Sequence, residues 1–127
     1  IEGVASGVDM LDCVMPTRVA RNGSLYTITG RINITNQRFK SQDIPIDPDC
    51  NCMLCRNYST AYLHHLFKAK ELLALRLASI HNLTFMANLM KQIRESIVED
   101  KFESFRTIFW AQYQTANNSK NDSKKNQ

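Results

Sequence analysis

Three cysteines within a six-residue stretch are the residues whose types and spacing most clearly suggest chemistry. Cys50, Cys52 and Cys55 form the pattern C-x-C-x2-C in "DPDCNCMLCRNYS". The pattern admits a disulfide framework, a redox pair or three ligands of a metal ion. With Cys13 the chain holds four cysteines. Nothing else in the sequence suggests an oxidising compartment, and reduced thiols clustered in a loop are more often metal ligands.

A redox pair requires C-x-x-C at the start of a helix, and Cys52 and Cys55 have that spacing. The additional Cys50, two residues upstream, weakens this interpretation. Zn²⁺ prefers thiolate and imidazole ligands in a closed tetrahedron, with Zn–S distances of about 2.3 Å. The tight spacing lets three thiolates converge without closing a long loop. The sequence therefore favours a zinc site.

Three histidines compete to be the fourth ligand. His64 and His65 belong to an expected helix whose start adjoins the thiols, and at about 1.5 Å rise per residue they lie several ångströms along its axis. His81 follows Cys55 by 26 positions, a distance at which a returning helix comes back beside the loop. This geometry favours His81 and leaves structural or surface roles for the other two. Cys13 is a further candidate, although it is expected to be a thiol in the core of a strand segment.

Four segments are expected to position these residues. Residues 1–35 are predicted to contain strands: "VDMLDCV" (8–14) alternates in polarity, and "SLYTITGRINIT" (24–35) has the pattern of a hairpin turning at Thr29-Gly30. Residues 36–57 carry two prolines and three of the cysteines and are predicted to be irregular. Together with the helices that follow, they form the expected zinc-binding subdomain, residues 36–100.

Helices are predicted over most of the remaining sequence. The stretch from Tyr58 to about Asp100 is expected to be helical, with Ser59 as its N-cap and an apolar stripe formed by Met86, Leu89, Met90, Ile93 and Ile97. Residues 101–113 predict a short aromatic-rich helix. Residues 114–127 are predicted to be disordered, because the last eleven residues contain no apolar side chain.

Composition and charge narrow the class of protein. The chain has 127 residues, 43% of them hydrophobic, which suits one small domain. No run approaches the roughly 20 apolar residues of a membrane span, and no signal peptide is visible, so the expected location is the cytoplasm. Residues 13–42 contain no acidic residue but carry five basic ones, namely Arg18, Arg21, Arg31, Arg38 and Lys40. Binding to a polyanion such as RNA and a solvated face balanced elsewhere explain this charge equally well.

Four blocks of sequence carry a resemblance to a known family: "GVDMLDCVMPTRVARNG" (7–23), "GRINITN" (30–36), "CNCMLCRNYSTAYLHHLFKAKELLALRL" (50–77) and "IHNLTFMANLMKQIRESI" (80–97). In this order they resemble the C-terminal portion of bacterial tRNA-guanine transglycosylases, the queuine tRNA-ribosyltransferase family. The resemblance implies an α/β fold, the C-terminal part of a (β/α)8 TIM-type barrel with an inserted, mainly helical zinc subdomain. It also implies one structural Zn²⁺ per chain, bound by Cys50, Cys52, Cys55 and His81.

The resemblance further implies an activity. The family exchanges guanine at the wobble position of the tRNA anticodon for a 7-deazaguanine, preQ1 in bacteria. The reaction requires a carboxylate that attacks C1′ of the ribose and forms a covalent glycosyl ester. Asp12 matches this nucleophile, at the carboxyl end of an expected barrel strand. Without the resemblance a salt-bridged strand-end carboxylate would be favoured, and Asp9, on the opposite strand face, is the weaker candidate.

Partners follow from the same resemblance. Arg18 and Arg21 match arginines that hold the tRNA anticodon loop, and Val14 matches an apolar residue near the ribose, where ordinary packing explains it equally well. Arg31 and Arg38 are weaker candidates for extending this basic surface. The intact enzyme is expected to be a homodimer.

The length of the chain sets an expectation of its own. A barrel of this kind takes about 250 residues, and the second catalytic aspartate is expected upstream. The chain is therefore expected to be an inactive part of the enzyme. The alternative from another class is a non-enzymatic, zinc-stabilised RNA-binding module.

Overall fold

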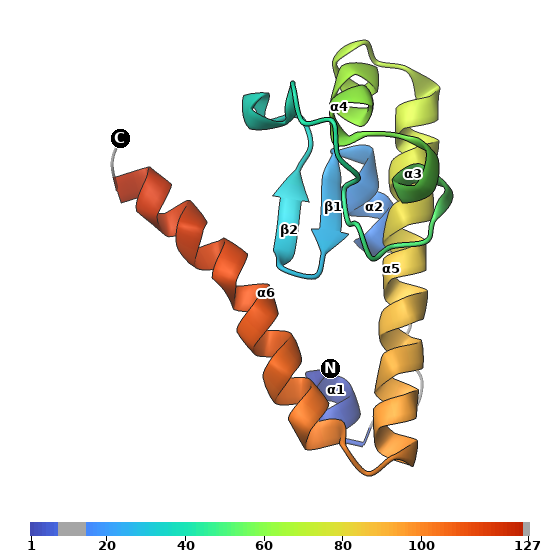
Figure 1. Cartoon of the computed structure of the whole chain (residues 1–127), viewed down its shortest axis with the longest axis vertical. Coiled ribbons are helices and arrows are strands. Elements are labelled where there is room, and N and C mark those ends of the chain that lie inside the picture. The colour runs from blue at the N-terminus through green and yellow to red at the C-terminus, as the bar shows by residue number, and fades with distance from the viewer. Residues whose placement is uncertain (8–14, 126–127) are drawn as a thin grey trace.

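A β-hairpin and a cluster of short helices pack around one long helix (Figure 1). The computed structural model describes residues 1–7 and 15–125, with side chains as far as Tyr113. The elements in chain order are α1 (Glu2–Ala5), α2 (Met15–Arg21), β1 (Ser24–Thr27), β2 (Gly30–Asn33), the 3₁₀ helix η1 (Gln37–Phe39), α3 (Met53–Asn57), α4 (Thr60–Lys68), α5 (Leu72–Val98) and α6 (Phe102–Lys125).

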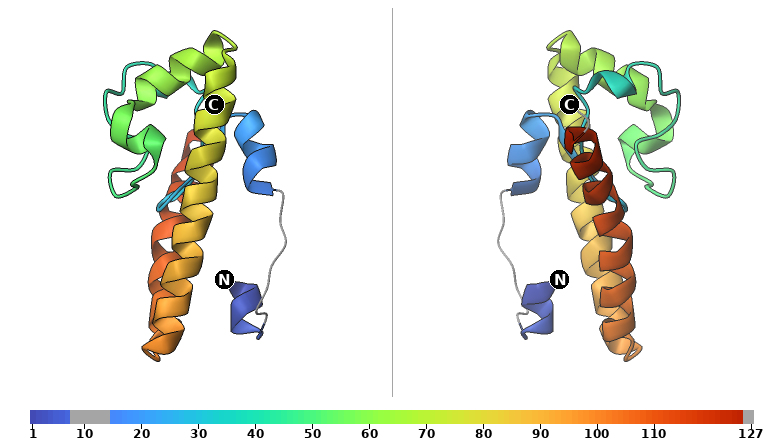
Figure 2. Two further views of the ribbon diagram at one scale, coloured as in Figure 1. Left: turned by 90° about the vertical axis from the view of Figure 1, so that its right-hand side faces the viewer. Right: turned by 90° about the vertical axis from the view of Figure 1, so that its left-hand side faces the viewer.

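Helix α5 organises the arrangement, because α2, β1, α3 and α4 all contact it. Figure 2 shows α2 on one side of α5. Helix α3 and the loop that precedes it lie on the opposite side of α5. Helix α6 turns back from the lower end of α5 and crosses toward the hairpin, where it contacts β2. Within the described residues, none of the helices combines the length and apolar character that crossing a membrane requires.

The hairpin was predicted from sequence and is confirmed. Strands β1 and β2 pair antiparallel in a register that runs from Ser24–Asn33 to Thr27–Gly30. The connecting loop is therefore Ile28-Thr29, one residue earlier than expected. Gly30 opens β2 with φ +138°, a conformation that favours glycine over every residue with a Cβ. All four residues of β1 are buried, because this strand is covered by α2 as well as by α5.

The predicted helix from Tyr58 to Asp100 is two helices. Ser59 caps α4 as expected, since its side chain accepts a hydrogen bond from the Tyr62 N–H. The chain then turns at Lys70, whose φ is +57°, and the Glu71 N–H donates to the Leu66 carbonyl. This is the hydrogen bond of a Schellman-type helix end. The break was missed because a lysine, rather than the usual glycine, occupies the left-handed position.

Two other boundaries differ from expectation. The segment 36–57 was predicted to be irregular but contains η1 and α3. Helix α6 continues as far as Lys125, although the sequence predicted a helix ending near Tyr113 followed by disorder. Helical hydrogen bonds are local, so a helix already formed by apolar packing can propagate through polar residues without burying further apolar surface.

The architecture agrees with an α/β class, but the larger barrel is not seen. In the parts of the chain that the structure describes, the sheet is the two-stranded hairpin. The strand predicted over residues 8–14 lies outside the described residues. The (β/α)8 barrel therefore stays a prediction.

The hydrophobic core includes Cys52 and Cys55. Leu25, Ile34, Leu54, Leu63 and Leu77 are fully buried and belong to one cluster with Cys52 and Cys55. These residues come from the hairpin and its exit, from α3, α4 and α5. Full burial of each such aliphatic side chain contributes about 1.5–3 kcal/mol. Cys52 and Cys55 thus lie in the hydrophobic core on which the hairpin and helices α3, α4 and α5 pack.

Candidate metal centre

Helix α3 brings the cysteines together through its N-terminus. Cys52 is the N-cap residue, and its Sγ accepts a hydrogen bond from the Cys55 N–H at 3.4 Å. An N-cap and the residue three positions later lie on the same side of the first helical turn. Cys50 precedes the helix by three residues and faces the same point, and none of these three thiols is in a disulfide.

His81 approaches this group from α5, on which α3 packs. Its Nδ1 lies 3.3 Å from Cys55 Sγ, 3.6 Å from Cys52 Sγ and 3.8 Å from Cys50 Sγ. All four potential ligand atoms lie within 4.8 Å of one another. The four residues predicted as ligands are therefore close enough to hold one metal ion.

The spacing of these atoms matches a tetrahedral site. Metal–sulfur bonds of about 2.3 Å and metal–nitrogen bonds of about 2.0–2.1 Å place sulfur and nitrogen about 3.5–3.6 Å apart in a tetrahedron. The three observed Nδ1–Sγ distances, 3.3–3.8 Å, bracket this value. Residue types and geometry both fit a divalent ion that accepts sulfur and nitrogen ligands.

The orientation of His81 is set by a second hydrogen bond. Its Nε2 lies 2.7 Å from the Tyr26 carbonyl oxygen, and the whole side chain is buried. A carbonyl only accepts, so the proton of the neutral ring is assigned to Nε2. Nδ1 then presents its lone pair to the three sulfurs, and a backbone carbonyl on the far nitrogen is a common feature of metal-binding histidines.

The three thiols do not share negative charge equally. The hydrogen bond from the Cys55 thiol lowers the pKa of Cys52 to about 3. The same hydrogen bond, together with burial, raises the pKa of Cys55, and burial raises the pKa of Cys50. Burial and the neighbouring thiols therefore oppose the ionisation of all three sulfurs at once when no cation is bound. A divalent ion stabilises all three thiolates, so metal binding is coupled to loss of the other thiol protons.

The remaining histidines lie elsewhere. His64 is buried in α4, where its Nδ1–H donates to the Ile34 carbonyl oxygen at 2.7 Å. His65 is exposed. Neither belongs to the group of potential ligands, which agrees with the structural and surface roles expected from their helical positions.

The predicted RNA-contacting residues are only partly described. Arg18 and Arg21 are exposed on α2, and no ion pair among the described side chains involves either of them. Asp12 and Val14 lie outside the described residues, as do Asp9 and Cys13.

The two weaker basic candidates are exposed. Arg31 donates from Nε to the Ser24 hydroxyl oxygen at 2.6 Å, and the Arg38 guanidinium lies 4.5 Å from the centre of the Phe39 ring.

One buried polar residue was missed by the sequence analysis. Asn82, adjacent to His81, is fully buried and all its amide atoms are hydrogen-bonded. A signal existed, because Ala74, Ala78 and Asn82 recur every four residues on the buried face of α5. An asparagine on such a face needs polar partners, which the sequence alone does not identify.

The fold and this site define a small α/β metal-site module, in which three cysteines and one histidine converge inside a hairpin-and-helix core. The family model described as queuine tRNA-ribosyltransferase matches residues 1–115. The chain therefore belongs to the queuine tRNA-ribosyltransferase family, as its resemblance predicted.

Individual relatives agree with this assignment. Proteins named queuine tRNA-ribosyltransferase include one from Dehalococcoides mccartyi that is 59% identical over 117 residues, which are 92% of this chain and 30% of the relative. One from Herpetosiphon aurantiacus is 50% identical over 91% of this chain and 29% of its own length. One from Francisella tularensis is 52% identical over 89% and 31%. The chain thus spans about 30% of the length of the relatives that it matches.

Proposed function

We propose that the protein containing this sequence is a tRNA-guanine transglycosylase. In this proposal it replaces guanine at the anticodon wobble position of tRNA with a 7-deazaguanine such as preQ1. Membership of the family over residues 1–115 is the observation that carries the proposal. The bacterial character of the matching sequence blocks supports preQ1 as the incoming base.

Asp12 is the proposed nucleophile. Its carboxylate oxygen bonds to C1′ of the target ribose as the bond from C1′ to the guanine nitrogen breaks, and guanine leaves after accepting a proton. The incoming deazaguanine, having lost a proton, then displaces the carboxylate from C1′ and restores the glycosidic bond. Two displacements at the same carbon retain its configuration. A second aspartate outside this chain is expected to transfer the protons.

Arg18, Arg21 and Val14 are proposed to hold the neighbouring nucleotides. The two arginines are three positions apart on a helix, so they lie on one face, and both are exposed. Guanidinium groups bind phosphate oxygens and base edges through paired hydrogen bonds. A nucleotide that is turned out of its stack for reaction requires its neighbours to be fixed.

The metal in this proposal is one structural Zn²⁺ per chain, held by Cys50, Cys52, Cys55 and His81. Four protein ligands complete a tetrahedron and leave no position for a reactive water.

The role of the zinc is to fasten the loop that carries the cysteines. Residues 40–52 are otherwise tied to the start of α4 by the Thr60 N–H and hydroxyl, which donate to the Ile44 carbonyl, and by the Ala61 N–H, which donates to the Gln42 carbonyl.

The larger assembly is also a proposal that rests on the family. Residues 1–35 are assigned to the end of a (β/α)8 barrel, residues 36–100 to its zinc subdomain, and the whole enzyme to a cytoplasmic homodimer.

The test is exchange of labelled guanine into unmodified tRNA by the full-length protein. Wild-type protein is expected to incorporate label and Asp12→Asn to incorporate none, whereas Asp9→Asn serves as the matched control and retains activity. The 127-residue chain alone is expected to be inactive. A full-length protein that binds tRNA but does not exchange guanine would instead support the non-enzymatic RNA-binding module.

A further inference from the structure

We infer that Asn82 is a positioning residue that fixes the arginine-bearing helix α2 against strand β1 and the metal-site helix α5. The inference rests on the proposed tRNA-binding role of α2. Asn82 does not contact the thiols, and it acts through the backbone of two other elements.

Both polar atoms of the Asn82 side-chain amide are hydrogen-bonded to backbone groups of these elements. Its Oδ1 accepts from the Tyr26 N–H at 3.1 Å, and its Nδ2 donates to the Pro16 and Ser24 carbonyl oxygens at 3.0 Å each. These partners are 56 to 66 positions away in sequence. One side chain thus connects α5, α2 and β1, which are far apart in the sequence.

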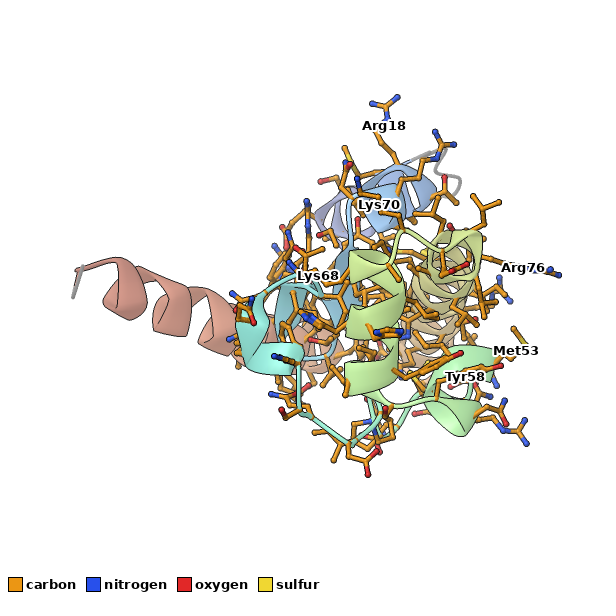
Figure 3. All side chains as sticks on the ribbon, turned by 90° about the horizontal axis from the view of Figure 1, so that it is seen from above. Arg18, Met53, Tyr58, Lys68, Lys70 and Arg76 are labelled. Carbon is orange, nitrogen blue, oxygen red and sulfur yellow. The ribbon has the colours of Figure 1, made fainter. Side chains whose placement is uncertain are left out.

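The bond to Pro16 determines where the arginines lie. Pro16 belongs to the first turn of α2, and at about 1.5 Å rise per residue Arg18 and Arg21 follow it by about 3 Å and 7.5 Å along the axis. Rotation or sliding of α2 on α5 would break this bond. The inner side of α2 is completed by buried Val19 and Ala20, and Figure 3 shows Arg18 projecting from α2 away from the body of the molecule.

His81 and Asn82, which are consecutive residues of α5, connect helix α2, which carries the two arginines, to the metal centre. Consecutive helical residues point in directions about 100° apart. His81 reaches the cysteines, and Asn82 reaches α2, which lies on the other side of α5 from α3 (Figure 2). Both residues bind the backbone of Tyr26, His81 at the carbonyl and Asn82 at the N–H. The thiol cluster, β1 and α2 are therefore parts of one hydrogen-bonded unit.

A thermodynamic cycle in the zinc-loaded, full-length protein separates positioning from general stability. Asn82→Ala is combined with the double variant Arg18→Ala/Arg21→Ala, and the Kd for tRNA is measured over a range of salt concentrations. Asn88→Ala, an exposed position on the same helix, is the matched control. If Asn82→Ala does not fold, Asn82→Ser, which keeps one polar hydroxyl, replaces it in the same cycle.

Asn82→Ala is expected to weaken tRNA binding about tenfold and to leave the zinc content unchanged. The plot of the logarithm of the association constant against the logarithm of salt concentration has a negative slope. This slope should become shallower by about 1.4, because two phosphate contacts to single-stranded RNA are lost. In the background that lacks both arginines, Asn82→Ala should change affinity less than twofold, because residues acting through the same contacts are not additive.

Three results would overturn the inference. They are an equal loss in both backgrounds, unchanged affinity, or loss of zinc from Asn82→Ala, which would place its effect at the metal centre. Absence of tRNA binding by the wild-type protein would overturn the proposed function along with it, and so the two failures are distinguishable.

Discussion

Replacing His81 by alanine is expected to weaken zinc binding while leaving the three thiols in place. The ring nitrogen of His81 lies 3.3–3.8 Å from all three sulfurs, and its other nitrogen binds the Tyr26 carbonyl. Structural zinc sites contribute about 10–16 kcal/mol of apparent binding free energy near neutral pH. An equal share for each of four ligands is about 2.5–4 kcal/mol, which corresponds to a Kd roughly 70- to 900-fold higher.

A smaller effect on folding accompanies the loss of the ligand. The Tyr26 carbonyl, buried with β1, loses the hydrogen bond from His81, and a typical intramolecular hydrogen bond contributes about 0.5–1.5 kcal/mol. Zinc affinity is measured by competition with a colorimetric chelator, and zinc content by elemental analysis.

His64→Ala is the matched control, because His64 is also buried and also binds a backbone carbonyl. It should lose stability and keep its zinc. Normal zinc affinity in His81→Ala, together with zinc loss in His64→Ala, would refute the ligand assignment.

Two further predictions concern stability. Removal of zinc by a chelator should lower the melting temperature of the full-length protein and make residues 40–52 sensitive to protease, since the metal joins Cys50 and Cys52 of this loop to His81 on α5; an unchanged digestion pattern would contradict the structural role of the metal. Gly23→Ala should lower the free energy of unfolding by about 1–2 kcal/mol, because Gly23 has φ +81° and an added Cβ would lie 3.2 Å from Ile34 Cγ2; denaturant unfolding measures this, with Gly7→Ala, which also has positive φ but open space around it, as the comparison.

The parts of the fold that could be predicted are those that depend on short-range sequence patterns. The Ser59 cap and the hairpin depend on residues within a few positions of each other, and both are confirmed. The helix end at Lys70 was missed because this residue adopts φ +57° without being glycine, whereas the end near Asp100, which has the same φ, was predicted. Helix α3 was missed because Cys52, its N-cap, and Cys55, in its first turn, were interpreted as metal ligands in an irregular loop.

The candidate site likewise contains residues that short-range sequence patterns could predict and residues that they could not. The spacing of the three cysteines is visible in the sequence, and His81 was favoured because a helix of suitable length returns to the loop. The partners of Asn82 lie on α2 and β1, so its role depends on tertiary packing that no local pattern encodes. The nucleophile assignment depends on the family resemblance, since Asp12 lies outside the described residues.

If this sequence supplies the nucleophile of a base-exchange enzyme, one of its carboxylates forms a covalent bond to RNA, and the position of that bond can be measured. Full-length protein is denatured during turnover with tRNA in the absence of an incoming base, digested, and mapped by mass spectrometry. We expect a ribose-linked adduct on Asp12, in the peptide that leads into Arg18. An adduct on a different carboxylate, or none while guanine exchange proceeds, would contradict it.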